Sequence, residues 1–185
     1  MAQNQRFIKK IAVLGAGVMG AQIAAQCVNA GIPCLLYDLP AAEHNKNAIA
    51  DKAIANLYKL KPSPFGFSQA AQFIQAKNYA ENLNELLECD LIIEAIAERL
   101  DWKHSLYQQI IPYLNEHAIF VSNTSGLSIN KLVEGLPASL QKRFCGMHYF
   151  NPPRYMHLVE LIPTQKTEPS LVDFLETWLT KIGRA

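Results

Sequence analysis

Two residues in the second half of the chain could carry acid–base chemistry. His148 opens the stretch HYFNPP at residues 148–153, and Glu160 follows in LVEL at residues 158–161. An imidazole with its ordinary pKa of about 6.5 can accept a proton near neutral pH, and a carboxylate bonded to the ring selects which nitrogen is the base. Both residues lie in apolar segments that predict neighbouring strands, so the pair could lie face to face. Taken singly, each also fits a plainer role: a hydrogen-bonded histidine at the core edge, or a solvated strand glutamate.

A glycine pattern near the N-terminus predicts a bound nucleotide. Gly15, Gly17 and Gly20 form G-x-G-x-x-G between a short apolar segment and a helix-like one. The first glycine permits a tight turn, the second lets the backbone approach a pyrophosphate, and the third lets the helix pack against the strand. The pyrophosphate would lie at the helix N-terminus, where N–H groups and the helix dipole favour an anion. Alone, the pattern is also compatible with an ordinary glycine-rich turn.

Asp38 strengthens the dinucleotide interpretation. It ends the next predicted strand at about the 20-residue spacing of an acidic residue that binds the adenosine ribose. A carboxylate there would repel the 2′-phosphate of NADP, and residues 39–42 contain no arginine that could bind one. The sequence therefore predicts NAD as the cofactor, although FAD could use a similar glycine turn.

The elements that must position these residues alternate between strand-like and helix-like segments, which is typical of a parallel sheet covered on both faces. We expect strands at residues 11–14, 33–37, 73–78, 91–95, 119–122, 144–148 and 158–162. We expect helices at residues 18–30, 41–61, 102–114, 128–134 and 169–181. The predicted fold class is α/β: a Rossmann-like, doubly wound, mostly parallel sheet with a helical arm formed by residues 41–61.

Composition narrows the function classes further. Half of the 185 residues are hydrophobic and the net charge is +1, which predicts one globular domain. Acidic and basic residues are mixed, so neither nucleic acid nor a membrane surface is an expected partner. No apolar run reaches the ~20 residues of a membrane span, and the polar opening Met1 to Arg6 has no signal-like apolar region behind it, so we expect a cytoplasmic protein. The cysteines have no paired spacing and are predicted to be buried free thiols, without zinc or another metal: Cys27, Cys34, Cys89 and Cys145.

The motifs, taken in order, resemble the N-terminal NAD-binding domain of the 3-hydroxyacyl-CoA dehydrogenase family of fatty-acid β-oxidation. GAGVMG is followed by IIEAIAERLDWK, SNTSGLSI and GMHYFNPPRYMHLVEL, over nearly all of residues 1–185. The resemblance implies oxidation of an L-3-hydroxyacyl-CoA to the 3-ketoacyl-CoA, with hydride passing to NAD. It also implies a helical C-terminal domain beyond Ala185 that closes the site, supplies an asparagine and forms most of a homodimer contact. We therefore expect this fragment to bind NAD and to turn over poorly.

The resemblance assigns roles to three residues of the reaction site. His148 corresponds to the catalytic base that takes the 3-hydroxyl proton, and Glu160 to the carboxylate that orients its ring. Ser125 corresponds to a hydroxyl that contacts the substrate oxygen beside the nicotinamide, although a serine in this loop could also form a turn or helix cap. Many family members have a second serine where this chain has Gly126.

Four further residues match cofactor positions of the family. Glu98 and Lys103 correspond to positions around the ribose and the nicotinamide side, with a salt pair at a helix start as the plainer interpretation. Asn151 corresponds to a nicotinamide-side position and Met19 to one near the pyrophosphate turn. Asn151 could instead simply begin an Asn-Pro turn.

Lysines of the predicted arm resemble the family's contacts to the CoA moiety. Lys52 and Lys59, with Lys46 and Lys61, could neutralise the phosphates of an acyl-CoA substrate. They could equally solvate an exposed helical face.

Other functions share part of this pattern. An NAD(H)-binding module without turnover would need the glycines and Asp38 but not the combination of Ser125, His148 and Glu160. A structural relative with a decayed site is disfavoured because the catalytic residues are intact here. A dehydrogenase of sugar acids or small hydroxy acids would share the first half of the pattern. The longer parent could also resemble the forms fused to an enoyl-CoA hydratase.

Overall fold

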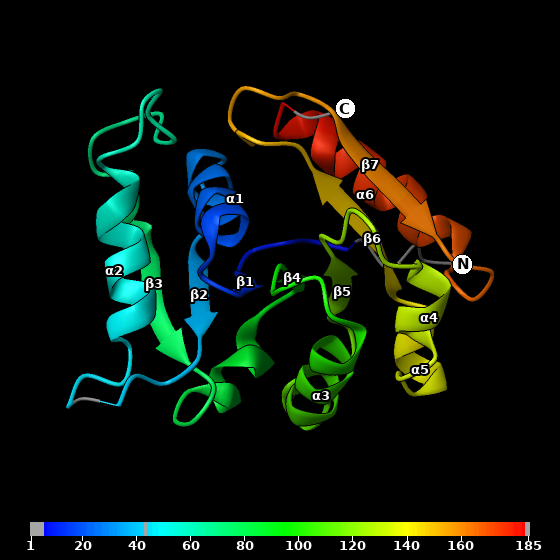
Figure 1. Cartoon of the computed structure of the whole chain (residues 1–185). Helices are drawn as coiled ribbons and strands as arrows, with labels where there is room; N and C mark the ends of the chain where they lie inside the picture. Colours follow the sequence, from blue (N-terminus) through cyan, green and yellow to red (C-terminus); the bar gives the residue numbers. More distant parts are fainter. Residues whose placement is uncertain (1–5, 43, 184–185) are drawn as a thin grey trace.

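A seven-stranded sheet of order β3-β2-β1-β4-β5-β6-β7 forms the centre of the computed structural model, which describes residues 6–42 and 44–183 (Figure 1). Neighbouring strands pair in parallel from β3 to β6, and β7 alone is antiparallel, alongside β6. The strand order reverses between β1 and β4, the place where open α/β sheets bind ligands. The strands are β1 (Ile11–Leu14), β2 (Cys34–Asp38), β3 (Ile74–Asn78), β4 (Leu91–Glu94), β5 (Ile119–Ser122), β6 (Phe144–Tyr149) and β7 (Val159–Pro163).

Helices cover both faces of the sheet. Figure 1 shows α1, α2 and α6 on one side and α3, α4 and α5 on the other. The helices are α1 (Val18–Asn29), α2 (Ala48–Leu57), α3 (Leu100–Ile110), α4 (Ile129–Val133), α5 (Ala138–Gln141) and α6 (Pro169–Lys181). Short 3-10 segments are η1 (Ala70–Phe73), η2 (Leu83–Glu88) and η3 (Ile111–Tyr113). The doubly wound, mostly parallel sheet predicted from the sequence is confirmed.

The central strand explains the continuous apolar runs in the sequence. Ile11 and Val13 pack into the core beneath α1, α2 and α6, whereas Ala12 and Leu14 pack into the core beneath α3 and α4. All four side chains are fully buried. A strand buried on both faces needs apolar residues at every position, because neither side of the pleat meets water.

The helical arm is shorter than predicted. Helix α2 covers only Ala48–Leu57, not residues 41–61. The backbone N–H of Ala41 donates to the Lys46 carbonyl oxygen (3.0 Å), which closes a loop before the helix. Within that loop the Asn45 side-chain oxygen accepts a hydrogen bond from the backbone N–H two residues later (3.0 Å). Such local bonds compete with helical ones, so a helix-like composition did not extend the helix.

Other departures are small. The sequence did not predict α5, η1 or η2, which are too short to show a helical period. The helix predicted at residues 102–114 begins two residues earlier as α3, and η3 forms its last part. Helix α6 has the predicted bounds. The four cysteines are buried free thiols, as predicted.

In the part of the chain formed by residues 6–42 and 44–183, no group of three or more His, Cys, Asp or Glu side chains could hold a metal ion. None of its helices is long and apolar enough to cross a bilayer. Residues 1–5 of the polar opening lie outside the described residues, as do residues 184–185.

Candidate active site

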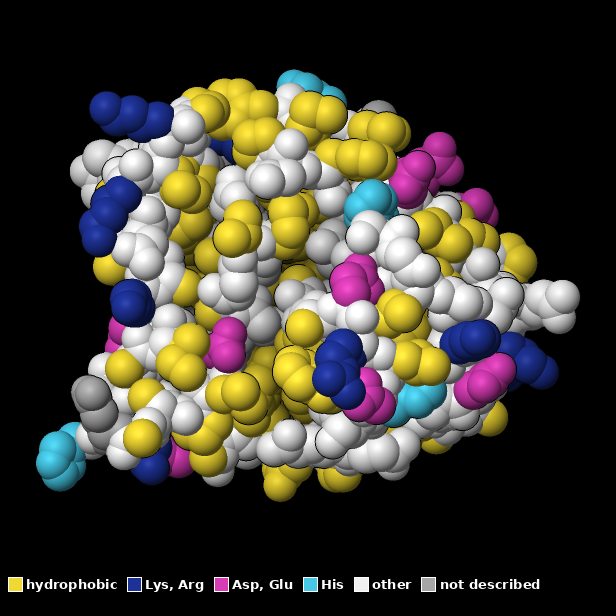
Figure 2. Space-filling model, viewed as in Figure 1, with side chains coloured by type: hydrophobic (Ala, Val, Ile, Leu, Met, Phe, Trp, Pro, Cys, Tyr) yellow, Lys and Arg dark blue, Asp and Glu magenta, His cyan; other side chains and the backbone are white. Residues whose placement is uncertain are grey.

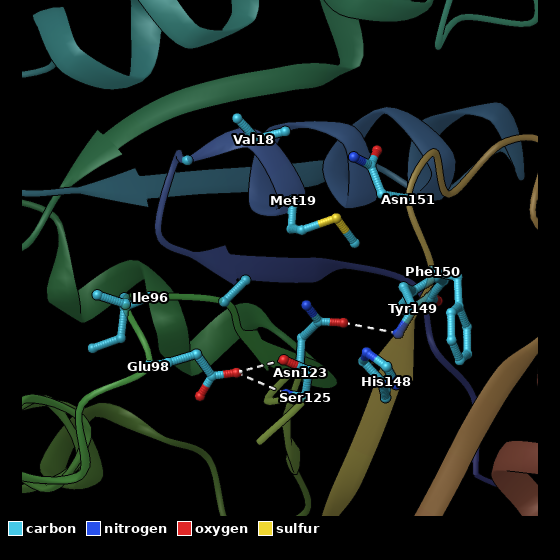
Figure 3. A pocket seen from close by; sticks show the side chains of 13 residues that line it. Val18, Met19, Ile96, Glu98, Asn123, Ser125, His148, Tyr149, Phe150 and Asn151 are labelled. Carbon is cyan, nitrogen blue, oxygen red and sulfur yellow. Dashed lines mark hydrogen bonds between the residues drawn. The ribbon is translucent and has the colours of Figure 1, made fainter. Parts of the chain in front are cut away.

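Two cavities meet at the carboxyl ends of the central strands. The first, of about 580 Å³, is lined by Met19, Glu98, Asn123, Ser125, His148 and Asn151 among others (Figure 3). The second, of about 490 Å³, is lined by Asp38, Leu39, Tyr79, Trp102 and Gln109 among others. Gly17 and residues 95–97 line both. The two cavities therefore share a wall at the point where the strand order reverses, and together they suit a ligand with two halves.

The strand register brings His148 and Glu160 together. They are directly opposite each other in the antiparallel β6–β7 pair, so their side chains leave the same face. The distance from His148 Nδ1 to Glu160 Oε2 is 2.9 Å. The histidine side chain is 17% exposed, and its ring packs against Phe150 with ring centroids 4.5 Å apart. The predicted face-to-face arrangement is confirmed, and a ring held at Nδ1 has Nε2 left for a substrate.

Glu98 organises the loop that follows β5. Its Oε1 accepts hydrogen bonds from the backbone N–H (2.7 Å) and the hydroxyl (3.2 Å) of Ser125, and its Oε2 accepts one from the Thr124 hydroxyl (2.6 Å). Burial alone would raise the pKa of Glu98, but these bonds and the nearby Lys103 charge outweigh it and lower that pKa. The carboxylate is therefore ionised at neutral pH, and it fixes Ser125 at the wall of the first cavity (Figure 3).

A buried charged cluster supports this wall from behind. Glu94, at the end of β4, accepts hydrogen bonds from Lys103 Nζ (2.5 Å) and the Ile96 backbone N–H (2.8 Å) on one oxygen. Its other oxygen accepts from the hydroxyls of Tyr107 (2.8 Å) and Ser122 (2.7 Å). The cluster thus satisfies all its buried charges and ties the loop after β4 to α3 and β5.

Lys103, which was predicted to lie at a cofactor position, belongs to this buried cluster. Its side chain is 1% exposed and pairs with Glu94, not with Glu98. It lies outside the linings of both cavities in the described part of the chain. Its hydrogen bond to the Ile96 carbonyl oxygen (3.3 Å) makes it a support of the loop.

The three glycines have the spatial relations that a dinucleotide turn needs. Gly15 has a φ of +102°, and a Cβ on it would lie 2.8 Å from the Ala95 carbonyl oxygen. A Cβ on Gly20 would lie 1.8 Å from the Gly15 carbonyl oxygen, so the helix can approach the strand only without one. A Cβ on Gly17 would meet nothing within 4 Å, and Gly17 lines both cavities. The open side of Gly17, at the N-terminus of α1, fits a pyrophosphate.

Asp38 is held by the same turn. One carboxylate oxygen accepts a hydrogen bond from the Ala16 N–H (2.6 Å), and the other accepts one from the Leu39 N–H (2.7 Å). The carboxylate lines the second cavity, beside the half-exposed Trp102. It is therefore positioned to accept further hydrogen bonds from a ligand there.

Met19 and Asn151 lie across the first cavity from Glu98 and Ser125 (Figure 3). The Asn151 side-chain oxygen accepts a hydrogen bond from Gln22 Nε2 (3.2 Å), which ties the segment after β6 to α1. These two predicted cofactor residues are thus brought to the same cavity as the reaction residues.

Asn123 and Phe150 belong to the site but were not predicted. The Asn123 side-chain oxygen accepts a hydrogen bond from the backbone N–H of Tyr149 (2.8 Å), which holds the end of β6 beside β5 (Figure 3). Phe150 packs against the His148 ring. A polar residue directly after a buried parallel strand was the available signal for Asn123. Packing of Phe150 on His148 depends on side-chain rotamers that the sequence pattern does not specify.

The lysines of the arm are separate from both cavities. Lys52 is exposed on α2, and Lys59, just beyond the helix, donates to Asn56 Oδ1 (3.0 Å). Dark-blue side chains lie along this side of the molecule in Figure 2, at the left over α2. Lys46 and Lys61 are also exposed, but both lie outside the helix.

Known proteins match the chain over almost its whole length. The family model described as 3-hydroxyacyl-CoA dehydrogenase, NAD binding domain, matches residues 10–185. A probable 3-hydroxyacyl-CoA dehydrogenase from Deinococcus radiodurans is 44% identical over 171 residues, which cover 91% of this chain and 49% of that protein. A putative fatty acid oxidation complex trifunctional enzyme from Rickettsia prowazekii is 44% identical over 179 residues, which cover 96% of this chain and 25% of that protein.

The fold also matches a solved structure. The crystal structure of 3-hydroxybutyryl-CoA dehydrogenase from Escherichia coli has a TM-score of 0.80 with this chain at 26% identity, covering 96% of this chain and 37% of that one. The chain spans about half the length of the Deinococcus relative and a quarter of the Rickettsia one.

Proposed function

Because the chain belongs to the family of NAD-binding domains of 3-hydroxyacyl-CoA dehydrogenases, we propose that it carries the hydride-transfer site of an enzyme that interconverts L-3-hydroxyacyl-CoA and 3-ketoacyl-CoA. The observation that carries the proposal is the His148–Glu160 contact of 2.9 Å on the wall of a cavity that also contains Ser125. An NAD-binding protein without turnover would not need a base, its orienting carboxylate and a hydroxyl in one cavity. Bound NAD supplies the acceptor for the hydride.

His148 acts as the general base in the oxidation direction. Its Nδ1–H donates to Glu160, which leaves Nε2 unprotonated and able to take the proton of the substrate 3-hydroxyl. The Glu160 carboxylate then stabilises the imidazolium that forms. In the reduction direction the imidazolium returns the proton to the 3-oxygen.

Ser125 binds the substrate 3-oxygen. Its hydroxyl donates to Glu98 in the free protein (3.2 Å), and its backbone N–H donates to the same carboxylate at 2.7 Å. The shorter backbone bond keeps the residue in place while the hydroxyl turns to the substrate. A donor fixed in this way stabilises the negative charge that develops on the oxygen.

The cofactor residues divide between the two cavities. Gly15, Gly17 and Gly20 shape the pyrophosphate turn, and Asp38 accepts hydrogen bonds from the adenosine ribose in the second cavity. Met19 and Asn151 border the nicotinamide in the first. The Asp38 carboxylate would repel a 2′-phosphate, which favours NAD over NADP.

Several expectations for the whole protein remain predictions. Lys52 and Lys59 are proposed to bind CoA phosphates, and their exposure is compatible with that role. A part in fatty-acid β-oxidation, homodimer formation, a cytoplasmic location and low turnover of residues 1–185 also remain to be tested.

A substrate assay tests the proposed function. The protein is incubated with L- or D-3-hydroxybutyryl-CoA and with NAD or NADP, and NAD(P)H formation is followed by absorbance. We expect turnover, even if slow, only with the L-substrate and NAD. NADH binding without turnover of either enantiomer would contradict the enzyme and favour an NAD(H)-binding module.

A further inference from the structure

A single arginine joins two segments that are distant in sequence. Arg154 lies between β6 and β7, and its Nη1 donates hydrogen bonds to the carbonyl oxygens of Ser63 (2.8 Å) and Phe65 in the arm loop, residues 61–66 after α2. The neighbouring Tyr155 hydroxyl donates to the same Ser63 oxygen (2.8 Å). Both segments lie at the upper end of the molecule in Figure 1. The arm is therefore tied to the connection between the two strands that carry the proposed base and its orienting carboxylate.

The arm loop is held from its other side by α1. The side chain of Asn29, the last residue of α1, donates to the Pro64 carbonyl oxygen (2.8 Å) and accepts from the Gly66 N–H (2.8 Å). Phe65 is 6% exposed and belongs to the core cluster that contains the buried side of α1. Three successive carbonyl oxygens of the loop thus accept hydrogen bonds from side chains. The loop is therefore a fixed point, to which Arg154 anchors its own segment.

The anchored segment, residues 151–156, is a compact proline turn beside the first cavity. The backbone N–H groups of Tyr155 and Met156 both donate to the Pro152 carbonyl oxygen, each at 3.0 Å. Two adjacent prolines have fixed φ angles, which leaves the turn few other conformations. The first residue of the turn, Asn151, lines the first cavity. A displacement of the anchor would therefore be passed on to Asn151.

The bond that holds Asn151 from the opposite side is the weaker one. Its side-chain oxygen accepts from Gln22 Nε2 at 3.2 Å, near the long end of the range for such bonds. The same nitrogen also donates to the Val18 carbonyl oxygen (3.1 Å), and Asn151 itself is exposed to water. The bonds of Arg154 come from a charged donor, and such bonds are about twice as strong as neutral ones. The guanidinium is therefore the stronger of the two anchors.

We propose that Arg154 is a positioning residue of the hydride-transfer site. By holding the proline turn on the arm loop, it keeps Asn151 at the nicotinamide half of the first cavity. The turn also follows His148 closely, so the same anchor restrains the end of the strand that carries the base. Arg154 lines neither cavity in the described part of the chain, and it therefore acts through Asn151. The inference rests on the proposed function, because it requires NAD with its nicotinamide in the first cavity.

Asn29 provides a matched control. Like Arg154, it makes two hydrogen bonds to the arm loop, but it makes them from α1. The substitutions Asn29→Ala and Arg154→Met therefore each remove two bonds from the same loop, and only Arg154→Met releases the proline turn. Because both bonds of Arg154 come from one nitrogen, Arg154→Lys supplies an ammonium group that can restore at least one of them.

The test compares binding, hydride transfer and stability in these variants. Affinities for NADH and ADP-ribose are measured by titration, the chemical step by single turnover of bound NADH with acetoacetyl-CoA, and the Tm without ligand. For Arg154→Met we expect the rate of the chemical step to fall about 10- to 100-fold, because the nicotinamide and the base are misplaced. Its NADH affinity should fall about threefold, since part of one hydrogen bond is lost, and its ADP-ribose affinity should not change.

The other two variants separate positioning from stability. Arg154→Lys should recover part of the lost rate. Asn29→Ala should lower the Tm about as much as Arg154→Met does, because it removes the same number of bonds from the loop. Its rate of hydride transfer and its affinities for both ligands should equal those of wild type.

Each other outcome has a definite meaning. A rate for Arg154→Met equal to that of Asn29→Ala, or an equal loss of NADH and ADP-ribose affinity, would overturn the inference and leave the proposed function intact. If Arg154→Met does not fold, Tyr155→Phe decides, because this 43% exposed residue loses only its bond to Ser63. A rate about two- to threefold below wild type would then support the inference, and an unchanged rate would overturn it. Failure of the wild-type protein to bind NADH or to reduce acetoacetyl-CoA would overturn the proposed function and the inference with it.

Discussion

Replacing Lys103 by methionine removes the positive charge that faces the buried Glu94 carboxylate. The two side chains are 1% and 0% exposed, and their charged atoms lie 2.5 Å apart. Methionine keeps most of the apolar stem of lysine, so the packing loss should be below about 1.5 kcal/mol. Breaking one side of a buried ion pair costs about 3–5 kcal/mol. Because Glu94 keeps hydrogen bonds from Ile96, Tyr107 and Ser122, we expect a loss near the lower limit, about 3 kcal/mol.

Urea unfolding followed by circular dichroism measures this loss. The double variant Glu94→Gln with Lys103→Met removes both charges and should be more stable than Lys103→Met by about 1 kcal/mol or more. The exposed Lys166→Met is the control, with an expected change within about 0.5 kcal/mol. Two results would refute the assignment of Lys103 and Glu94 as a buried ion pair. One is a loss below about 1 kcal/mol for Lys103→Met, and the other is a double variant that is no more stable than Lys103→Met.

Three further predictions concern the cofactor turn and its neighbours. Gly17→Ala should change the free energy of unfolding by about 1 kcal/mol or less yet weaken NADH binding. Gly20→Ala should lower the free energy of unfolding by about 2–4 kcal/mol, because its Cβ would lie 1.8 Å from a backbone oxygen. Urea unfolding and NADH titration check both predictions. Asp38→Asn should reduce the preference for NADH over NADPH about tenfold, measured by titration with each, because a like-charge repulsion is removed. The pKa of Glu98 in the folded protein lies below its ordinary value of 4.5. The ionised carboxylate therefore stabilises the folded state fully above pH 4.5, and this stabilisation is lost as the pH falls through the lower pKa of the folded state. The stability difference between wild type and Glu98→Gln should therefore shrink in acid, and a difference that grows there would contradict this assignment.

The sequence predicted the strands well because they are buried on both faces. Apolar runs such as Ile11–Leu14 have no competing interpretation once a turn follows them, and the strand bounds agree within a residue or two. The sequence also indicated that His148 and Glu160 could lie face to face on adjacent strands joined through Asn151-Pro152-Pro153, and the strand register pairs them. In each of these cases local pattern and tertiary packing favour the same structure.

The remaining features depend on partners that are distant in sequence. Lys103 matched a cofactor position of the family, and its salt bridge with the buried Glu94 could not be predicted from the sequence. Asn123 is recognisable as a site residue only when the end of β6 lies beside it. These relations are set by three-dimensional packing, which residue types and spacing do not specify.

The most direct test of the proposed reaction is a single-turnover measurement on His148→Gln. The protein, in excess over NADH, is mixed with acetoacetyl-CoA, and NADH loss is followed beside a separate NADH titration. We expect the rate of the chemical step to fall about 10²- to 10⁴-fold, as for loss of a general acid–base group, with NADH affinity within about twofold of wild type. A rate within about threefold of wild type, with NADH still bound, would contradict the assignment of His148 as the proton-transfer residue.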